Sequence, residues 1–233
     1  MTTNEKNSST SAAKLNSLRA AVLGANDGIV STSSVVMGVA GATNNTQAIF
    51  TAGMAALVAG ALSMAVGEYV SVSSQSDAEK AYIEQERLSL STNPEQELAE
   101  LTEAYVNRGV SPATAAQVAE ELTAKDALKA HLQVQFNIDE EDLNSPMQAA
   151  TASLFAFIAG GIIPFLAVIF SPDNYRIPLT VAAVVAALLI TGYLSAYAGG
   201  ANKTRAVIRV IVGGLLAMAI TYAIGYLFGT TVL

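Results

Sequence analysis

The chain of 233 residues has no cysteine and no tryptophan, and it has a single histidine. Without cysteine there is no disulfide framework, no thiolate metal site and no thiol redox motif. Any metal ion must therefore be bound by carboxylate, thioether, imidazole or backbone oxygen groups. The sequence also has no Gly-x-x-x-x-Gly-Lys-Ser/Thr loop, no His/Cys cluster and no nucleophile–base arrangement. These absences argue against an ATP-driven pump and against an enzyme.

Charged residues are scarce as well. They make up 13% of the chain, whereas 52% of the residues are hydrophobic, and the mean hydropathy is +0.43. This composition lies outside the range of ordinary soluble domains, so lipid is the expected solvent. The first seventeen residues are polar and lack the apolar core of a secretory signal. We therefore expect the first hydrophobic segment to be retained as a membrane span.

Five stretches are apolar over the roughly 20 residues that a helix needs to cross a bilayer. They cover residues 18–42, 48–74, 147–170, 178–198 and 205–228. The sequence thus predicts an all-α membrane protein with five transmembrane helices. Its expected parts are a polar tail (1–17), the first two spans (18–74), an inserted domain (75–144) and the last three spans (145–233).

The insert at 75–144 differs sharply from its surroundings. It contains 15 of the 19 acidic residues and 5 of the 12 basic ones, a local net charge of −10. Asn93-Pro94 and Ser111-Pro112 are typical helix starts, and Gly109 is typical of a helix end. We expect a water-exposed acidic domain of three or four helices, near 76–91, 94–107, 112–123 and 125–136.

The basic residues predict how the chain crosses the membrane. Eleven of the twelve Lys and Arg residues fall on one side of a five-span arrangement, and only Arg176 falls on the other. Because positive residues stay in the cytoplasm, the N-terminus and the acidic domain are expected to be cytoplasmic and the C-terminus outside. Tyr193 and Tyr197 are expected to lie in the aromatic belt at the membrane surface.

Ionisable residues are costly inside a membrane and by default mark a site or a pathway. The spans contain Asp27 and Glu68, at depths of roughly 13 Å and 9 Å from their cytoplasmic ends at 1.5 Å per residue. Met64 lies one turn before Glu68 on the same helix face. Two carboxylates and a thioether suit a softer divalent ion such as Fe²⁺, and buried carboxylates can exchange that ion for protons.

Each of these residues also has a simpler interpretation. Asp27 can be a buried carboxylate bonded to a neighbouring helix, Glu68 can extend to the membrane surface, and Met64 can be ordinary packing. In the insert, glutamates recur at helical spacing, as Glu97, Glu100 and Glu103 show. They are either an ion-binding surface or a solvated acidic face. We interpret His131 as a surface residue rather than a ligand.

Four segments resemble the vacuolar iron transporters and their bacterial homologues. They are 26–32 (NDGIVST), 61–72 (ALSMAVGEYVSV), 119–127 (AEELTAKDA) and 160–165 (GGIIPF), and the similarity runs from about Leu18 to Phe228. The resemblance implies a homodimer with an ion path between the first two spans at the dimer interface. It also implies transport of Fe²⁺, often with Mn²⁺, in exchange for protons, with no cofactor.

The resemblance assigns roles to individual residues. Asp27, Met64 and Glu68 match the intramembrane transport positions, and the insert resembles the family's cytoplasmic metal-binding domain. Glu86, Glu97 and Glu100 match glutamates that gather ions there. The chain departs from the pattern at Ser89 and Gln135, where two more carboxylates are expected, and at His131, where the family has methionine or another residue nearby.

The leading hypothesis is therefore a cell-membrane exporter of divalent iron or manganese. The expected partners are metal ions, protons, the lipid bilayer and a second copy of the chain, and no nucleic acid. The alternative is a membrane-anchored metal sensor or buffer, in which the acidic domain binds ions and the spans serve as an anchor. Five spans are more than an anchor needs.

Overall fold

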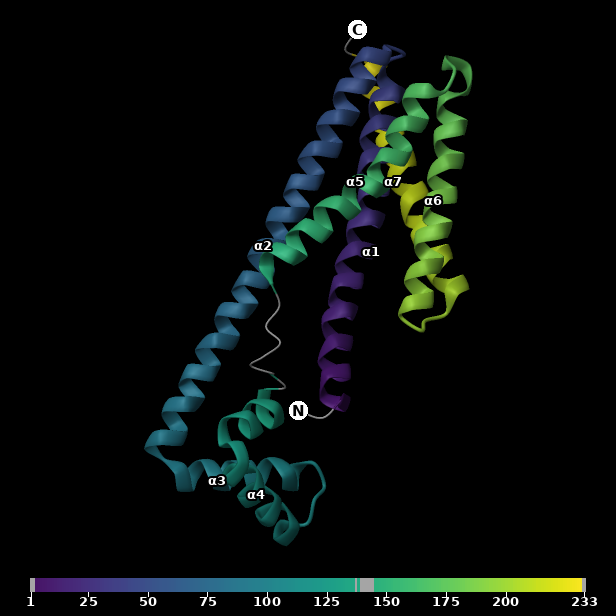
Figure 1. Cartoon of the computed structure of the whole chain (residues 1–233). Helices are drawn as coiled ribbons and strands as arrows, with labels where there is room; N and C mark the ends of the chain where they lie inside the picture. Colours follow the sequence, from purple (N-terminus) through teal and green to yellow (C-terminus); the bar gives the residue numbers. More distant parts are fainter. Residues whose placement is uncertain (1–2, 137, 139–144, 232–233) are drawn as a thin grey trace. The chain divides into compact units, whose positions relative to one another are not determined.

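The computed structural model describes residues 3–136, 138 and 145–231, and all regular structure in these residues is helical (Figure 1). The predicted all-α class is confirmed. Within this part of the chain, five helices are long and apolar enough to cross a membrane, which agrees with the five predicted spans. Residues 137 and 139–144, at the end of the predicted acidic domain, lie outside the described residues, as do 1–2 and 232–233.

The five span helices are α1 (Thr3–Ala42), α2 (Thr46–Thr92), α5 (Pro146–Phe170), α6 (Arg176–Ala198) and α7 (Lys203–Thr231). A short 3₁₀ turn, η2 (Asp173–Tyr175), leads into α6. Three further elements come between α2 and α5 in the sequence. They are α3 (Pro94–Asn107), α4 (Pro112–His131) and a π-helical turn, η1 (Leu132–Phe136).

Contacts along the chain divide it into two units. The first, called the acidic unit below, comprises Met1–Ala13 and Ser71–Ser145. The second, called the span unit, comprises Lys14–Val70 and Pro146–Leu233. Helix α2 contributes its first part to the span unit and its last part to the acidic unit.

The expectation that a new helix begins near residue 76 was wrong, because α2 continues without interruption to Thr92. The reason lies in the sequence between Gly67 and Pro94, which contains neither glycine nor proline. Its serines lower hydropathy without breaking a helix. The composition of α2 thus changes from apolar to polar along its length, but the backbone stays helical throughout.

The other helix boundaries of the acidic unit follow the sequence signals. Pro94 and Pro112 occupy first-turn positions of α3 and α4. Gly109 has a φ of +93°, and Val110 N–H donates to the carbonyl of Tyr105, as in a glycine-terminated helix. Asp126 is non-helical and divides α4, and its carboxylate accepts a hydrogen bond from Lys129 N–H at 3.0 Å. That carboxylate caps the segment that follows, close to the predicted helix start at 125.

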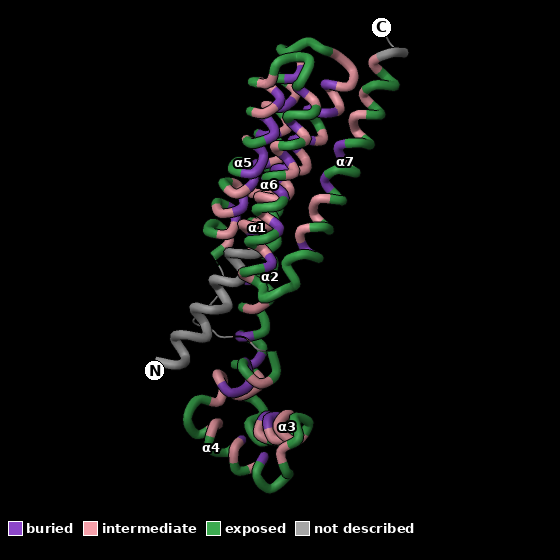
Figure 2. The backbone as a smooth tube through the Cα atoms, turned by 90° about the vertical axis from the view of Figure 1, so that its right-hand side faces the viewer, coloured by how far each residue is buried: buried purple, intermediate pink, exposed green. Residues whose placement is uncertain are grey.

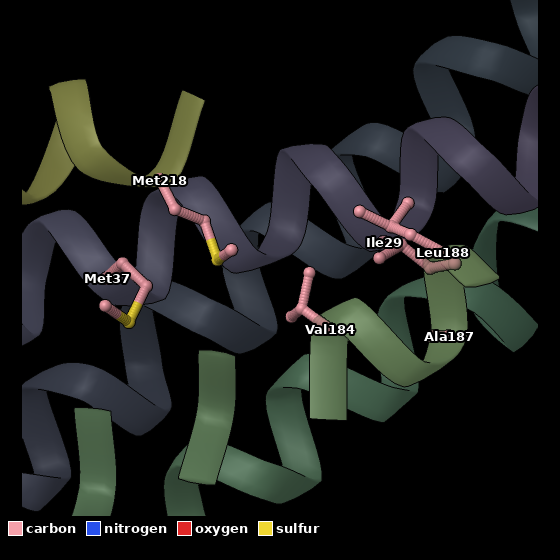
Figure 3. Close-up of a cluster of buried hydrophobic side chains, with 6 residues drawn as sticks. All are labelled: Ile29, Met37, Val184, Ala187, Leu188 and Met218. Atoms are coloured by element: carbon pink, nitrogen blue, oxygen red, sulfur yellow. The ribbon is translucent and has the colours of Figure 1, made fainter. Parts of the chain in front are cut away.

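The span unit is held together by apolar side chains from several helices. Figure 3 shows one cluster in which Ile29 and Met37 of α1 meet Val184 and Leu188 of α6 and Met218 of α7. A second cluster joins α1, α2 and α5 through Val36, Ala40, Ile49 and Val168.

Helix α1 crosses α5 with backbone against backbone. A Cβ atom added to Gly28 would collide with the carbonyl oxygen of Phe157, and one added to Gly160 would collide with the carbonyl oxygen of Ala25. Such close approach is what small residues permit in membrane helices. It fixes the segment of α1 that carries Asp27 against α5.

Many large apolar side chains of the span helices are exposed. Figure 2 shows exposed residues along much of α7. Examples are Leu62 and Val66 on α2, and Leu216 and Phe228 on α7. Residues of this kind on the outside are expected where lipid is the solvent. Arg176 connects the start of α6 to neighbouring elements. It donates hydrogen bonds to Thr46 Oγ1 of α2 at 2.8 Å and to Asp173 Oδ1 of η2 at 2.6 Å.

Candidate metal centre

Three ionisable side chains converge in the acidic unit from three different helices. Glu86 comes from the last part of α2, Glu97 from the first turn of α3, and His131 from the end of α4. One ligand atom from each lies within 4.8 Å of the other two. We call this group the Glu–Glu–His cluster.

The cluster is buried. The imidazole of His131 is 0% exposed, and each of the two carboxylate side chains is 9% exposed. His131 Nδ1 lies 2.8 Å from Glu86 Oε1 and 3.5 Å from Glu97 Oε2. The expectation that His131 is a surface residue was therefore wrong, because the packing of α3 and α4 encloses it.

Local sequence explains why these side chains meet. Pro94 fixes the start of α3, which places Glu97 in the first helical turn. The turn at Gly109 reverses the chain, so that α4 packs beside α3 through Leu101, Ala119 and Ala130. The break at Asp126 then redirects the end of α4, where His131 is located.

Burial and neighbouring charges shift the pKa values of the cluster residues. Burial raises the pKa of Glu97, and the negative charges of Glu86 and Glu100 raise it further, although His131 opposes this. Burial also lowers the pKa of His131, while Glu97 and Glu100 partly counteract that effect. Both shifts are toward the neutral form. A neutral imidazole can offer its lone pair to a metal ion, and a bound cation would offset the cost of burying the ionised carboxylates.

Two carboxylate oxygens and an imidazole nitrogen form a donor set that suits first-row divalent metals. A bound dication would supply the positive charge that the two glutamates lack. His131 Nε2 is also buried and has no hydrogen-bond partner within the described part of the chain. The side-chain amide of Gln135 lies beside the ring, with Nε2 at 3.2 Å from His131 Nδ1.

The structure also locates the other residues singled out in the insert. Glu100 is exposed, accepts a hydrogen bond from Gln96 Nε2 at 3.0 Å, and acts on the cluster through its charge. Ser89 is half-buried on α2, one turn after Glu86. Sequence reasoning missed His131 as a candidate ligand. The available signal is its position four residues before Gln135, which places the two side chains on the same helix face.

The intramembrane residues lie on α1 and α2. Asp27 is half-buried and accepts a hydrogen bond from Ser31 Oγ at 2.5 Å, one turn along its own helix. Met64 packs against a cluster of Leu57, Ala61 and Phe157. Glu68 is half-buried, one turn after Met64. Their convergence on one ion remains a prediction.

Phe157 of α5 lies between the two helices that carry these residues. Its backbone contacts α1 at Gly28, and its ring contacts α2 at Gly60. Within one chain, α5 therefore occupies the space between α1 and α2 at this level. A Cβ atom on either glycine would collide with Phe157, which explains why both positions are glycine.

Comparison with known proteins addresses the family directly. The model of the VIT family matches residues 18–226. The chain belongs to the VIT family. Members of this family are transporters, not enzymes, and they use no cofactor.

Several relatives align over most of their length. A protein named vacuolar iron transporter from Acanthamoeba castellanii is 46% identical over 214 residues, 91% of this chain and 79% of the relative. Vacuolar iron transporter homolog 2 from Arabidopsis thaliana is 39% identical, with 91% and 84% covered. Vacuolar iron transporter homolog 2 from Oryza sativa is 38% identical, with 91% of each chain covered.

Proposed function

We propose that this protein exports divalent iron or manganese from the cytoplasm in exchange for protons. Transport of metal ions is supported by the family and by the names of the relatives. The observation that carries the proposal is the buried Glu–Glu–His cluster in a chain that also has five helices able to span a membrane. The cluster supplies metal ligands, and the spans supply a route.

In the proposed pathway, the acidic unit collects ions from the cytoplasm and the span unit carries them. Asp27, Met64 and Glu68 form the transport site in the cytoplasmic half of the membrane. Two carboxylates neutralise a dication during passage, and the thioether favours Fe²⁺ over Mg²⁺ or Ca²⁺. Exchange with protons keeps the charge of this site balanced as ions leave it.

The proposed path also involves a homodimer. The position of α5 between α1 and α2 at Phe157 supports a passage that a second copy of the chain closes along the exposed face of α2. That face carries Leu62, Val66 and Tyr69, which are all exposed in the single chain. In a bilayer, association of copies along this face would depend on close packing of the helices rather than on removal of apolar surface from water.

The proposed orientation follows the positive-inside rule. The N-terminus and the acidic unit are cytoplasmic, and the C-terminus is outside. The proposed location is the cell membrane, although the relatives are named for the vacuole. Reaction of single-cysteine variants with a membrane-impermeant maleimide tests this orientation, because the native chain has no cysteine. Labelling of a cysteine at Asn174 in intact cells is expected, and labelling at Gln117 would contradict it.

The decisive experiment measures metal-driven proton movement in proteoliposomes that contain a pH-sensitive dye. Asp27→Asn is expected to abolish this movement, whereas Asp77→Asn, an exposed carboxylate on α2, is expected to preserve it. Full activity of Asp27→Asn would remove the membrane site. If the wild-type protein binds Fe²⁺ and Mn²⁺ but moves neither across the membrane, the alternative of a membrane-anchored sensor or buffer is correct.

A further inference from the structure

A cavity of about 380 Å³ opens in the span unit between α1, α6 and α7. Most of its wall is apolar and includes Val22, Leu23 and Val210. The polar groups that line it are Asn26, Thr191, Ser195 and Arg209. The cavity therefore combines an apolar surface with one cation, which is the chemistry of an amphipathic ligand.

Arg209 is the distinctive member of this wall. It is exposed, and no carboxylate in the described part of the chain lies within ion-pair distance of it. From Pro146 to the C-terminus the sequence has a single acidic residue, Asp173. That residue pairs with Arg176 at the start of α6, whereas the cavity lies at the end of α6. On α1, Asp27 follows the lining residue Asn26, and its carboxylate accepts a hydrogen bond from Ser31 Oγ. Arg209 is thus the only charged side chain among the residues that line the cavity.

The neighbouring residues place the cavity at the level of a membrane surface. Lys203 Nζ lies 4.9 Å and 5.0 Å from the ring centroids of Tyr193 and Tyr197. Stacked tyrosines beside a lysine are typical of the interface between headgroups and acyl chains. Arg209 is six residues into α7, roughly 9 Å deeper along the helix axis. Its side chain is long enough to return toward the headgroup level.

We propose that this cavity binds an anionic phospholipid, with the lipid phosphate at Arg209 and an acyl chain along the apolar wall. The hydroxyl of Ser195 is available to donate a second hydrogen bond to the phosphate. Basic pockets between membrane helices select acidic headgroups because the attraction is strong at low dielectric. A zwitterionic lipid would bring an ammonium group into the same positive region and is expected to bind less well.

The test measures lipid retained by the purified full-length protein in native mass spectrometry. Phosphatidylglycerol and phosphatidylcholine with identical acyl chains are offered in equal amounts. The wild-type protein is expected to retain more phosphatidylglycerol. Arg209→Gln is expected to reduce that retention about fivefold, which corresponds to roughly 1 kcal/mol for one basic residue near the membrane surface. Arg205→Gln, at another exposed arginine that does not line the cavity, is the matched control.

A second pair of variants tests the cavity rather than the charge. Ala198→Phe places a ring in the cavity without changing the charge, and it is expected to lower phosphatidylglycerol retention as well. Ala201→Phe, in the exposed turn after α6, is expected to leave retention unchanged. This pair keeps the proposal testable if Arg209→Gln does not fold.

Three outcomes would overturn the proposal. Equal retention of the two lipids by the wild-type protein would exclude selection of an anionic headgroup. Equal losses in Arg205→Gln and Arg209→Gln would show diffuse surface charge rather than a site. Displacement of the lipid by inorganic phosphate at equal phosphate concentration would mean that the cavity binds free phosphate and that the acyl chain contributes nothing.

Discussion

The two units of this protein hold their carboxylates in different ways. In the span unit, Asp27 is bonded to a hydroxyl one turn away on its own helix. In the acidic unit, Glu86 and Glu97 come from different helices and meet a buried imidazole. A carboxylate in an apolar span is conspicuous in a sequence but obtains its partner locally. The candidate metal ligands of the acidic unit do not stand out from neighbouring glutamates in the sequence, and only folding brings them together.

This comparison suggests a division of work. In the proposed function, the span unit places single charges along the path of the ion, so each of them is expected to be needed for passage. The acidic unit concentrates ligands at one point, which favours binding over release. Variants that separate passage from binding therefore test whether the two units differ as proposed.

The largest difference is expected between Glu68→Gln and Glu97→Gln in the same transport assay. Glu68→Gln is expected to abolish Mn²⁺ uptake into proteoliposomes at every metal concentration, because it removes a charge from the proposed path. Glu97→Gln is expected to slow uptake only at limiting metal, because it removes a collecting ligand. An equal loss of Mn²⁺ uptake in both variants would contradict the proposal that one unit serves passage and the other serves binding.

Removing a ligand of the Glu–Glu–His cluster should weaken binding of Mn²⁺ strongly. His131→Gln and Glu97→Gln are each expected to reduce affinity about 100-fold or more, since even partners outside the ligand shell contribute about 10- to 100-fold. Titration followed by Mn²⁺ electron paramagnetic resonance measures this. Glu103→Gln, an exposed carboxylate on the same helix as Glu97, is the control. An unchanged affinity in His131→Gln would show that the imidazole is only packed there.

Adding carboxylates should strengthen the same site. Gln135→Glu places a charge beside His131, where the native amide already lies 3.2 Å from the ring. An increase in Mn²⁺ affinity on the order of tenfold is expected, which corresponds to about 1.4 kcal/mol. Ser89→Glu tests the other missing position, and adding both is expected to raise the number of ions bound in calorimetry. No gain from Gln135→Glu would mean that its side chain does not reach the ion.

Binding should also depend on pH in a direction set by the cluster. A raised pKa means that Glu97 takes up a proton at a higher pH than an ordinary glutamate, whose value is 4.5. A lowered pKa means that His131 stays neutral at neutral pH. Protons and metal compete for the same oxygens, so Mn²⁺ affinity is expected to fall as pH drops from neutral toward 4.5. The slope measured by calorimetry should be smaller in Glu97→Gln, and an identical slope would contradict this.

The sequence predicted what depends on composition and local signals. Five spans followed from apolar length, and the turn at Gly109 followed from a residue that tolerates positive φ. Glu86 and Glu97 were singled out by resemblance to a family. The continuity of α2 was missed because the change from apolar to polar residues looked like a boundary.

His131 shows what local patterns do not reveal. Its neighbours in the sequence are compatible with an exposed helix end, and burial arises only because Asp126 redirects the chain and α3 packs against it. The side chains of α2, α3 and α4 meet at this imidazole only in the tertiary structure, so local sequence patterns do not reveal the contact. A spacing of four between His131 and Gln135 indicates a shared helix face but not which other helices it meets.

The crossing of α1 and α5 limits how the span unit can move. Where Gly28 and Gly160 meet the opposite backbone, no side chain is present to change rotamer and absorb a displacement. Displacement of α5 is therefore expected to be transmitted directly to the segment of α1 that carries Asp27. If the proposed transport involves opening to either side of the membrane, that movement is expected along other helix contacts of the span unit.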